Sequence, residues 1–285
     1  MDNEIFLVTA ATGTVGSDLV MKLAQAAPNS EIRCATRDPE SRSAKALQAY
    51  GKQVKPVKFD VNEPDTLKAV CEGVTQIYLL PPFLPNTMVE WHQSVMDAAQ
   101  ETGDLRYVVK HSVIGARAPK PDDMPSGVPL LHYRGEEVVM ATGVDYSVIR
   151  PTIFAQHFIK MPWVYEKGDD NFYLPIGSAK VAFLDARDIA TLAVFLLTQE
   201  DKSPYSGQAY ELTGPSAVTG VQMSDALSQA AGREIGYVDP AEDEFVARIR
   251  RFGGSEGIAN IYREAKEGWF GHVISPDFER VMRFP

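Results

Sequence analysis

The stretch IFLVTAATGTVG, from Ile5 to Gly16, decides the fold that we expect for this chain of 285 residues. An apolar run ends in a turn of small residues, and a segment with helical periodicity follows at once. A strand, a tight turn and a helix in this order offer free backbone N–H groups to the pyrophosphate of a dinucleotide. The spacing is A-x-x-G-x-x-G rather than G-x-G-x-x-G, so a turn without a ligand is the alternative interpretation.

Strand-like and helix-like segments alternate through the first half of the chain. We expect strands at residues 31–36, 54–59, 76–80, 105–111 and 146–149, and helices at 43–50, 64–71, 87–99 and 133–141. This alternation predicts an α/β fold with a doubly wound parallel sheet and helices on both of its faces. Beyond Pro151 the pattern loosens, with one more strand expected at 180–184 and a helix at 190–197. Residues 116–129 are interpreted as a surface loop that could act as a lid.

The composition excludes several classes of protein. The net charge is −10, which argues against a general affinity for nucleic acid or an anionic membrane. The first residues are polar and acidic, and we find no signal peptide and no apolar stretch of spanning length, so a cytoplasmic location is expected. Two cysteines do not suggest a disulfide framework, and the five histidines show no metal-ligand spacing, so no metal is expected.

Arg37 follows the second expected strand, at the position from which this type of fold reads the adenosine ribose. Its planar guanidinium suits the extra phosphate of NADP, so NADP is the favoured cofactor and NAD the less favoured one. Asp38, one residue further on, could still restore a preference for NAD. Asp60 ends the third strand, where its carboxylate either meets the adenine amino group or caps the next helix.

Leu80, Pro81 and Pro82 end the fourth expected strand. Prolines prevent further ladder pairing and keep the loop rigid, so we expect its backbone to line the route to the nicotinamide. A simple strand terminator is a compatible interpretation. Residues 150–158 follow the sixth strand and would form a wall of the nicotinamide and substrate pocket.

Strand alternation places Lys110 and Ser112 on one face of the fifth strand and His111 on the other. A lysine that ends a buried parallel strand indicates a phosphate, ribose or carboxylate partner, with an edge contact to solvent as the alternative. Ser112 would hydrogen-bond a substrate oxygen.

His132 and Tyr133 begin the next expected helix. His132 could donate a proton to a reduced product, because its ordinary pKa lies near neutrality. Tyr133 could donate a hydrogen bond to a carbonyl, and a capping or packing role for His132 stays open. Glu136, placed in the first turn, is expected to stabilise the helix or a neighbouring loop.

The turn TAATGTVG at residues 9–16 resembles the T-G-A-T-G-x-x-G turn of the NmrA-like, atypical short-chain dehydrogenase/reductases. The segments RDP at 37–39, VDYSVIRP at 144–151, KVAFLDARDIA at 180–190, YELTGP at 210–215 and GREI at 232–235 also resemble that family. The resemblance covers nearly the whole chain and is weakest after about residue 240.

The resemblance implies a Rossmann-type NAD(P)-binding domain over residues 1–151, with contributions from about 178–215. A smaller α/β substrate-binding part would comprise residues 152–177 and 216–285. Two departures from the family patterns matter. Ala10 replaces the first glycine of the turn, which costs about 1 kcal/mol if its φ is positive. The Tyr-x-x-x-Lys pair is absent, because Glu137 stands four residues after Tyr133.

In the ether and isoflavone reductases of this family a lysine at a helix start is catalytic, and His132 stands in the matching position. This resemblance makes His132 the first choice for the proton donor, with Tyr133, Lys110 and Ser112 as the other candidate catalytic residues. The residues expected to bind the cofactor are Ala10, Thr12, Gly13, Thr14, Val15, Gly16, Arg37, Asp60, Val61, Leu80, Pro81, Pro82, Lys110, Pro151 and Phe154.

Together these features predict an NADPH-dependent oxidoreductase that reduces a flat, electron-poor small molecule of the quinone, enone or imine type. The alternative is a non-catalytic NAD(P)-sensing regulator of the NmrA type, which the missing Tyr/Lys pair favours. The expected partner is a small-molecule substrate rather than nucleic acid or a membrane. The oligomeric state is left open, with a homodimer among the options.

Overall fold

The computed structural model describes residues 4–82, 87–117, 127–268 and 273–282. The chain divides into two compact units. The first comprises residues 1–113, 131–150 and 186–210, and the second comprises residues 114–130, 151–185 and 211–285.

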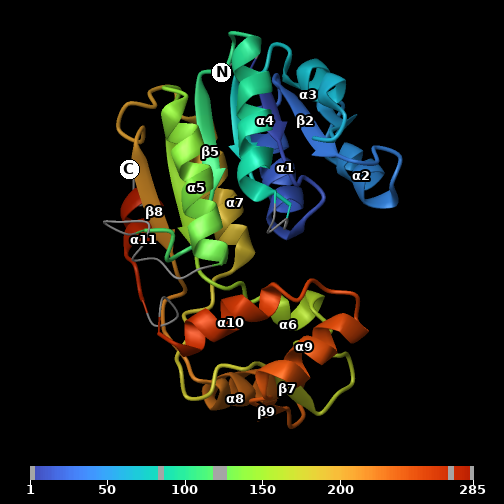
Figure 1. Ribbon diagram of the computed structural model, residues 1–285, viewed down its shortest axis with the longest axis vertical. Helices are drawn as coiled ribbons and strands as arrows, with labels where there is room; N and C mark the ends of the chain where they lie inside the picture. Colours follow the sequence, from blue (N-terminus) through green and yellow to red (C-terminus); the bar gives the residue numbers. More distant parts are fainter. Residues whose placement is uncertain (1–3, 83–86, 118–126, 269–272, 283–285) are drawn as a thin grey trace. The chain divides into compact units, whose positions relative to one another are not determined.

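A seven-stranded sheet forms the centre of the first unit (Figure 1). Its strands in chain order are β1 (Ile5–Val8), β2 (Glu31–Thr36), β3 (Val54–Lys58), β4 (Gln76–Leu79), β5 (Tyr107–His111), β6 (Asp145–Pro151) and β8 (Gln208–Leu212). They lie side by side in the order β3-β2-β1-β4-β5-β6-β8. Each neighbouring pair from β3 along this order to β6 is parallel. The order reverses direction at β1, so the expected doubly wound α/β fold is confirmed.

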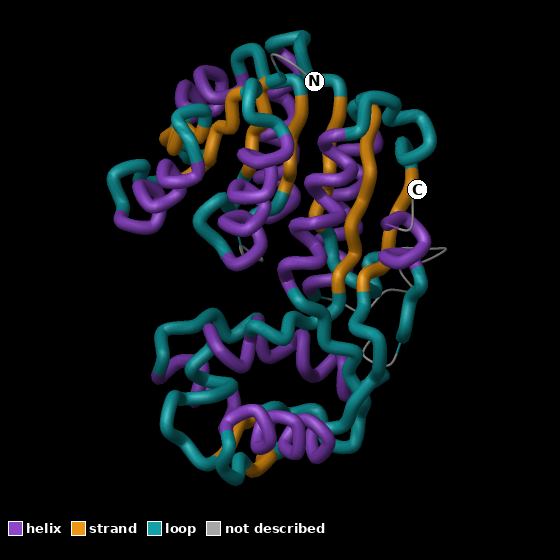
Figure 2. The backbone as a smooth tube through the Cα atoms, turned by 180° about the vertical axis from the view of Figure 1, so that it is seen from behind, coloured by secondary structure: helices purple, strands orange, loops and turns teal. Residues whose placement is uncertain are grey.

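Helices cover both faces of this sheet (Figures 1 and 2). They are α1 (Thr14–Ala26), α2 (Arg42–Leu47), the 3-10 turn Gln48–Tyr50, α3 (Pro64–Cys71), α4 (Met88–Glu101), α5 (Val128–Ala141) and α7 (Ala186–Thr198). Helix α1 packs beside α7, and α3 packs beside α4. Because both faces are covered, β1 is apolar along its whole length, and Phe6, Leu7 and Val8 are all buried.

The apolar core between the sheet and α3, α4 and α5 contains Leu7, Ile77 and Val108 from the strands and Trp91 and Val95 from α4. This packing fixes the carboxyl ends of β1, β4 and β5 next to one another, because Val8 pairs with Tyr78 and Leu79 pairs with Lys110. Ligands of doubly wound sheets bind at this edge.

Two expected elements differ from the structure. Residues 180–184 form no strand; Val181 and Leu184 make single bridges to Val218 and Phe154, while β8 takes the place beside β6. Helix α5 begins at Val128 rather than Tyr133, because Pro129 is tolerated in a first helical turn, where no N–H is needed. His132 and Glu136 therefore lie inside the helix. The expected loop falls largely on residues 118–126, outside the described residues.

The second unit is also built of helices and strands, but its sheet has two strands rather than seven. It contains α6 (His157–Lys160), β7 (Asn171–Tyr173), α8 (Gly220–Ala231), β9 (Gly236–Val238), α9 (Glu242–Arg251), α10 (Ile258–Lys266) and α11 (Asp277–Met282). Strands β7 and β9 pair in parallel. Phe172, Ile235, Phe245, Ile249 and Tyr262 are part of its apolar core.

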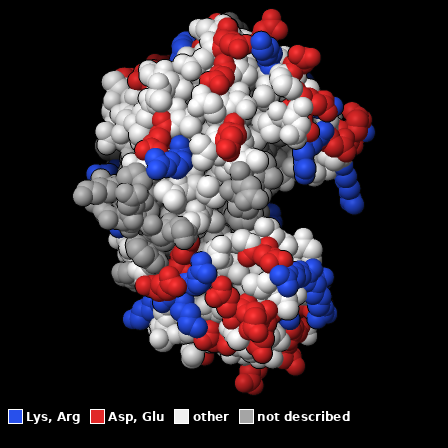
Figure 3. All heavy atoms as spheres, viewed as in Figure 1, with Lys and Arg blue, Asp and Glu red and all other residues white. Residues whose placement is uncertain are grey.

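Acidic and basic side chains are interspersed over the face of the molecule in Figure 3, in keeping with 38 acidic and 28 basic residues. Within the described ranges, no helix combines the length and the apolar character that crossing a membrane requires.

Candidate functional site

The turn between β1 and α1 is tight. Ala10 has a φ of +50°, and its carbonyl oxygen accepts a hydrogen bond from the N–H of Gly13 at 2.9 Å. A Cβ at Gly16 would lie only 2.2 Å from the same oxygen, so residue 16 must be glycine for the helix to start this close to the turn. The alanine at position 10 thus adopts the left-handed conformation that the first glycine of the family turn would adopt without strain.

The N-terminus of α1 is open to an anion. Gly13 is its N-cap and makes no side-chain capping bond, and the first turn holds no acidic residue. The N–H groups of Thr14, Val15 and Gly16 have no acceptor within the helix, because they belong to its first turn. Thr12 and Gly13 are exposed. The amide of Gly13 is used inside the turn, so the helical amides are the donors that remain for a phosphate.

Thr9 joins this turn to the loop that follows β4. Its hydroxyl donates to the carbonyl oxygen of Leu80 at 2.9 Å and accepts from the N–H of Leu80 at 2.7 Å. Pro81 is buried and Pro82 is exposed. Sequence reasoning missed the role of Thr9, although a hydroxyl at the end of a buried strand is a signal that could have been used.

Arg37 is exposed beyond the end of β2. Because Val8 of β1 pairs with Cys34 of β2, Arg37 lies at the same sheet edge as the turn. Among the described residues, its guanidinium has no hydrogen-bond or ion-pair partner. A planar donor group that is not engaged within the chain is available to an external phosphate.

Asp60 does not cap α3, whose N-cap is Glu63. Its carboxylate instead accepts from the backbone N–H and the side-chain amide of Asn62, both at 3.0 Å. The capping alternative is therefore wrong. The contact of Asp60 with adenine stays a prediction, and so does cofactor binding by the half-buried Val61.

Buried polar groups gather at the end of β5. Lys110 is fully buried, and its ammonium donates to the carbonyl oxygen of His111 and lies 3.4 Å from Nδ1 of His132. Burial lowers the pKa of Lys110 to about 7, and the Glu136 carboxylate opposes that shift. The alternative of an edge contact to solvent is wrong, because Lys110 is 0% exposed. Of the expected partners, a carboxylate is nearby as the charge of Glu136, and a phosphate or ribose contact stays a prediction.

Glu136 of α5 is the residue that sequence reasoning placed wrongly. It is fully buried and accepts from Arg150 of β6 at 3.0 and 2.6 Å, in a bidentate pair, while Ser112 also donates to it. The alternation of β5 predicted that Lys110 and Ser112 share one face, and in the structure both side chains contact residues of α5. That Glu136 of α5 lies opposite these two residues becomes visible only in the structure, where the helix begins at Val128 rather than Tyr133.

Burial lowers the pKa of His132 well below its ordinary value, and the charge of Lys110 and the neighbouring His111 and His92 add to this. The expectation that His132 titrates near neutrality is therefore wrong, and its imidazole is neutral at pH 7. Burial also lowers the pKa values of His92 and His111 to about 3. Tyr133 is half-buried.

Pro151 and Phe154 belong to the second unit. The carbonyl oxygen of Pro151 accepts from the N–H of Ile114 at 2.9 Å, and the Phe154 ring lies 5.7 Å from that of His157. Their contact with a cofactor stays a prediction.

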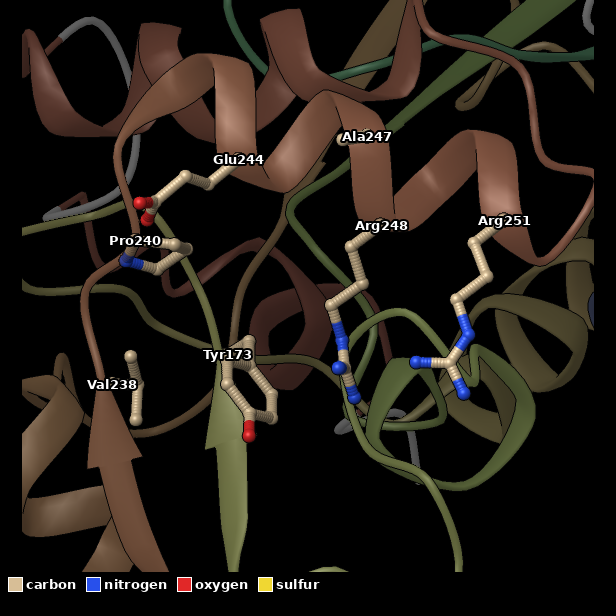
Figure 4. Close-up of a pocket in the computed structure, with 7 residues that line it drawn as sticks. All are labelled: Tyr173, Val238, Pro240, Glu244, Ala247, Arg248 and Arg251. Carbon is tan, nitrogen blue, oxygen red and sulfur yellow. The ribbon is translucent and has the colours of Figure 1, made fainter.

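The second unit also contains a hollow of about 360 Å³ between α9 and the β7–β9 pair (Figure 4). Arg248 lies with its guanidinium 3.8 Å from the ring centre of Tyr173, and its Nε donates to the carbonyl oxygen of Trp163 at 2.9 Å. These contacts assign Arg248 to the packing of α9 on the small sheet.

Comparison with known proteins identifies the relatives of the chain. The model of the NmrA-like family matches residues 2–281. An NAD(P)H azoreductase of Xenophilus azovorans is 31% identical over 91% of this chain and 85% of its own length. Quinone oxidoreductase 2 of Escherichia coli (strain K12) is 25% identical over 92% of this chain and 86% of its own length. The crystal structure of an NADPH-dependent quinone oxidoreductase from Escherichia coli, complexed with NADPH, has a TM-score of 0.79 and 24% identity, and the match covers 98% of this chain and 95% of that one.

Proposed function

The chain belongs to the NmrA-like family, and we propose that it is an NADPH-dependent reductase of a flat, electron-poor small molecule, with NADH as the less favoured reductant. Quinones and azo compounds are the first substrates to test, because the names of the relatives at 31% and 25% identity refer to these classes. Enones and imines follow from the same chemistry. The observation that carries the proposal is the uncapped N-terminus of α1 behind the tight Ala10–Gly16 turn.

The described residues fit a nicotinamide dinucleotide. The free amides of Thr14, Val15 and Gly16 would bind the pyrophosphate, and the loop Leu80–Pro82, held by Thr9, would lie along the bound cofactor. Arg37 would bind the 2′-phosphate of NADP. The cofactor, when bound, supplies a hydride, so the protein has to orient the acceptor and deliver one proton.

We assign the delivery of the proton to the polar groups at the end of β5. His132 is neutral, so it donates as an imidazole N–H and not as an imidazolium. The Ser112 hydroxyl donates to Glu136, which leaves its lone pairs to accept from a substrate hydroxyl. Tyr133 stays a candidate donor to a carbonyl oxygen.

The cytoplasm is the compartment that we propose, supported by Cys34 and Cys71, which are buried free thiols. Burial raises the pKa of both thiols to about 12, so neither acts as a nucleophile. A homodimer is the oligomeric state that we propose to test by light scattering.

The decisive experiment follows the loss of NADPH absorbance with a quinone, an azo dye and an enone as acceptors, with NADH in parallel. We expect turnover with at least one acceptor and a higher kcat/KM for NADPH than for NADH. Saturable NADPH binding without turnover of any acceptor would instead favour a dinucleotide-sensing regulator. A protein that binds neither coenzyme would contradict both functions.

A further inference from the structure

The polar cluster at the end of β5 contains more titratable groups than a single proton donor requires. The titratable groups that interact electrostatically with Lys110 are His132 and Glu136 on α5, His92 on α4 and His111 on its own strand. Neighbouring strands add Tyr78, whose hydroxyl bonds to Nδ1 of His111, and Arg150, which pairs with Glu136. This arrangement places one buried ammonium among three imidazoles.

We propose that Lys110 is the buried store of the transferred proton, that His132 conveys this proton to the substrate, and that Glu136 is the positioning residue that keeps Lys110 charged. The inference rests on the proposed reductase function. It goes beyond that function in two ways: it names the path of the proton to the substrate, and it gives the Glu136–Arg150 pair a role.

The contact between Lys110 and His132 determines the tautomer of His132. Lys110 has only N–H donors, and its Nζ lies 3.4 Å from Nδ1 of His132. Nδ1 must therefore act as the acceptor, so the neutral imidazole carries its own proton on Nε2. His132 is 8% exposed, whereas Lys110 is 0% exposed, so His132 is the member of the pair that lies nearer to the surface.

The transfer of the proton is balanced. NADPH, when bound, would supply the hydride to the acceptor, and the Nε2–H bond of His132 breaks as a proton passes to the oxygen or nitrogen of the reduced acceptor. An Nζ–H bond of Lys110 then breaks and an Nδ1–H bond of His132 forms. His132 ends neutral in its other tautomer, and Lys110 ends as a neutral amine. Water supplies the replacement proton after the product leaves, and both residues return to their starting forms.

Glu136 is fully buried, and Arg150 and Ser112 provide three hydrogen bonds to its carboxylate. Its negative charge favours the charged form of Lys110, against the effect of burial. Without that charge, the effect of burial would be unopposed, and the Lys110 ammonium would lose its proton at a lower pH.

The test compares the pH dependence of kcat in four forms of the full chain: wild type, Lys110→Arg, Lys110→Met and Glu136→Gln. In the wild type kcat should fall about tenfold per pH unit above about pH 7, because the ammonium is lost. Lys110→Arg should remove that fall, and Glu136→Gln should move its midpoint down by roughly one pH unit. Lys110→Met should have a low kcat without the fall.

Lys202 provides the matched control. It is a second lysine of the first unit whose pKa burial lowers, to about 8, and its ammonium donates to the carbonyl oxygens of Leu196 and Leu197 on α7. Lys202→Met should leave the midpoint of the kcat profile unchanged. An equal shift in this variant would show that the profile reports general electrostatics, and it would overturn the proposal.

A measurement without turnover keeps the proposal separate from the proposed function. Nitrogen-15 spectra of the histidine rings report which ring nitrogen carries the proton, and they can be recorded on the wild-type protein with Lys110→Met as reference. We expect the His132 signals to show the Nε2–H tautomer and to move as the pH passes about 7, and not to move in Lys110→Met. If the His132 signals move in this way but the protein reduces no acceptor, the reductase function is refuted, whereas the coupling between Lys110 and His132 stands. An Nδ1–H tautomer, or static signals, would overturn the proton store.

Discussion

Replacement of Glu264 by glutamine should stabilise the protein, although it removes a charged group. Glu264 lies on α10 and is 2% exposed, and neither carboxylate oxygen has a hydrogen-bond partner among the described residues. Burial raises the pKa of this carboxyl from its ordinary 4.5 to about 7; Arg263 opposes the shift, and Glu267 adds to it.

The magnitude follows from that pKa. A rise of the pKa from 4.5 to about 7, at about 1.4 kcal/mol for each pKa unit, corresponds to about 3–4 kcal/mol. The folded protein holds this proton up to a higher pH than the unfolded chain does. The free energy of unfolding therefore falls as the pH rises from about 4.5 to about 7, and the whole penalty is present above that range. Glutamine keeps the shape and cannot ionise, so Glu264→Gln should lack this loss.

Urea unfolding at about pH 5 and about pH 8 measures the difference. Glu264→Gln should be within about 1 kcal/mol of the wild type at the lower pH and about 3–4 kcal/mol more stable at the higher one. Glu267→Gln, an exposed carboxylate at the end of the same helix, is the control and should change little at either pH. A stability difference for Glu264→Gln that is the same at both pH values would refute the reasoning.

Three further predictions concern the dinucleotide turn and the residue beyond β2. Arg37→Ala should weaken NADPH binding by about tenfold to a hundredfold, through loss of a charge-assisted contact, and leave NADH binding nearly unchanged in calorimetry; an equal loss for both would refute the phosphate role. Gly16→Ala should lower the free energy of unfolding by about 1–3 kcal/mol in urea, because its Cβ would meet the Ala10 oxygen at 2.2 Å. Ala10→Gly should raise that free energy by up to about 1 kcal/mol, because φ is +50° here; a loss would show that the alanine is unstrained.

Much of the first unit could be predicted from local sequence. Strand β2 and helix α3 have the expected bounds, because alternation, Pro64 and the flanking turns mark their ends clearly. The strand expected at 180–184 failed for a non-local reason. Its apolar run is real, but β8 is the strand that lies beside β6, and pairing between distant segments leaves no local signal.

The candidate site was predictable in part. The turn and the shared face of Lys110 and Ser112 follow from the period of a strand and the glycine spacing. The pair of Glu136 with Arg150 depends on the rotation of α5 against β6, which a helix start misplaced by five residues conceals. The lowered pKa of His132 depends on burial, and burial is a property of the packed unit.

The most direct test of the account is titration calorimetry of the wild-type chain with NADPH, NADP, NADH and NAD. If the open N-terminus of α1 receives the pyrophosphate and Arg37 the extra phosphate, all four should bind saturably at one site, the NADP forms more tightly by about tenfold or more. Absence of heat and of saturation with every coenzyme would contradict the account at its base.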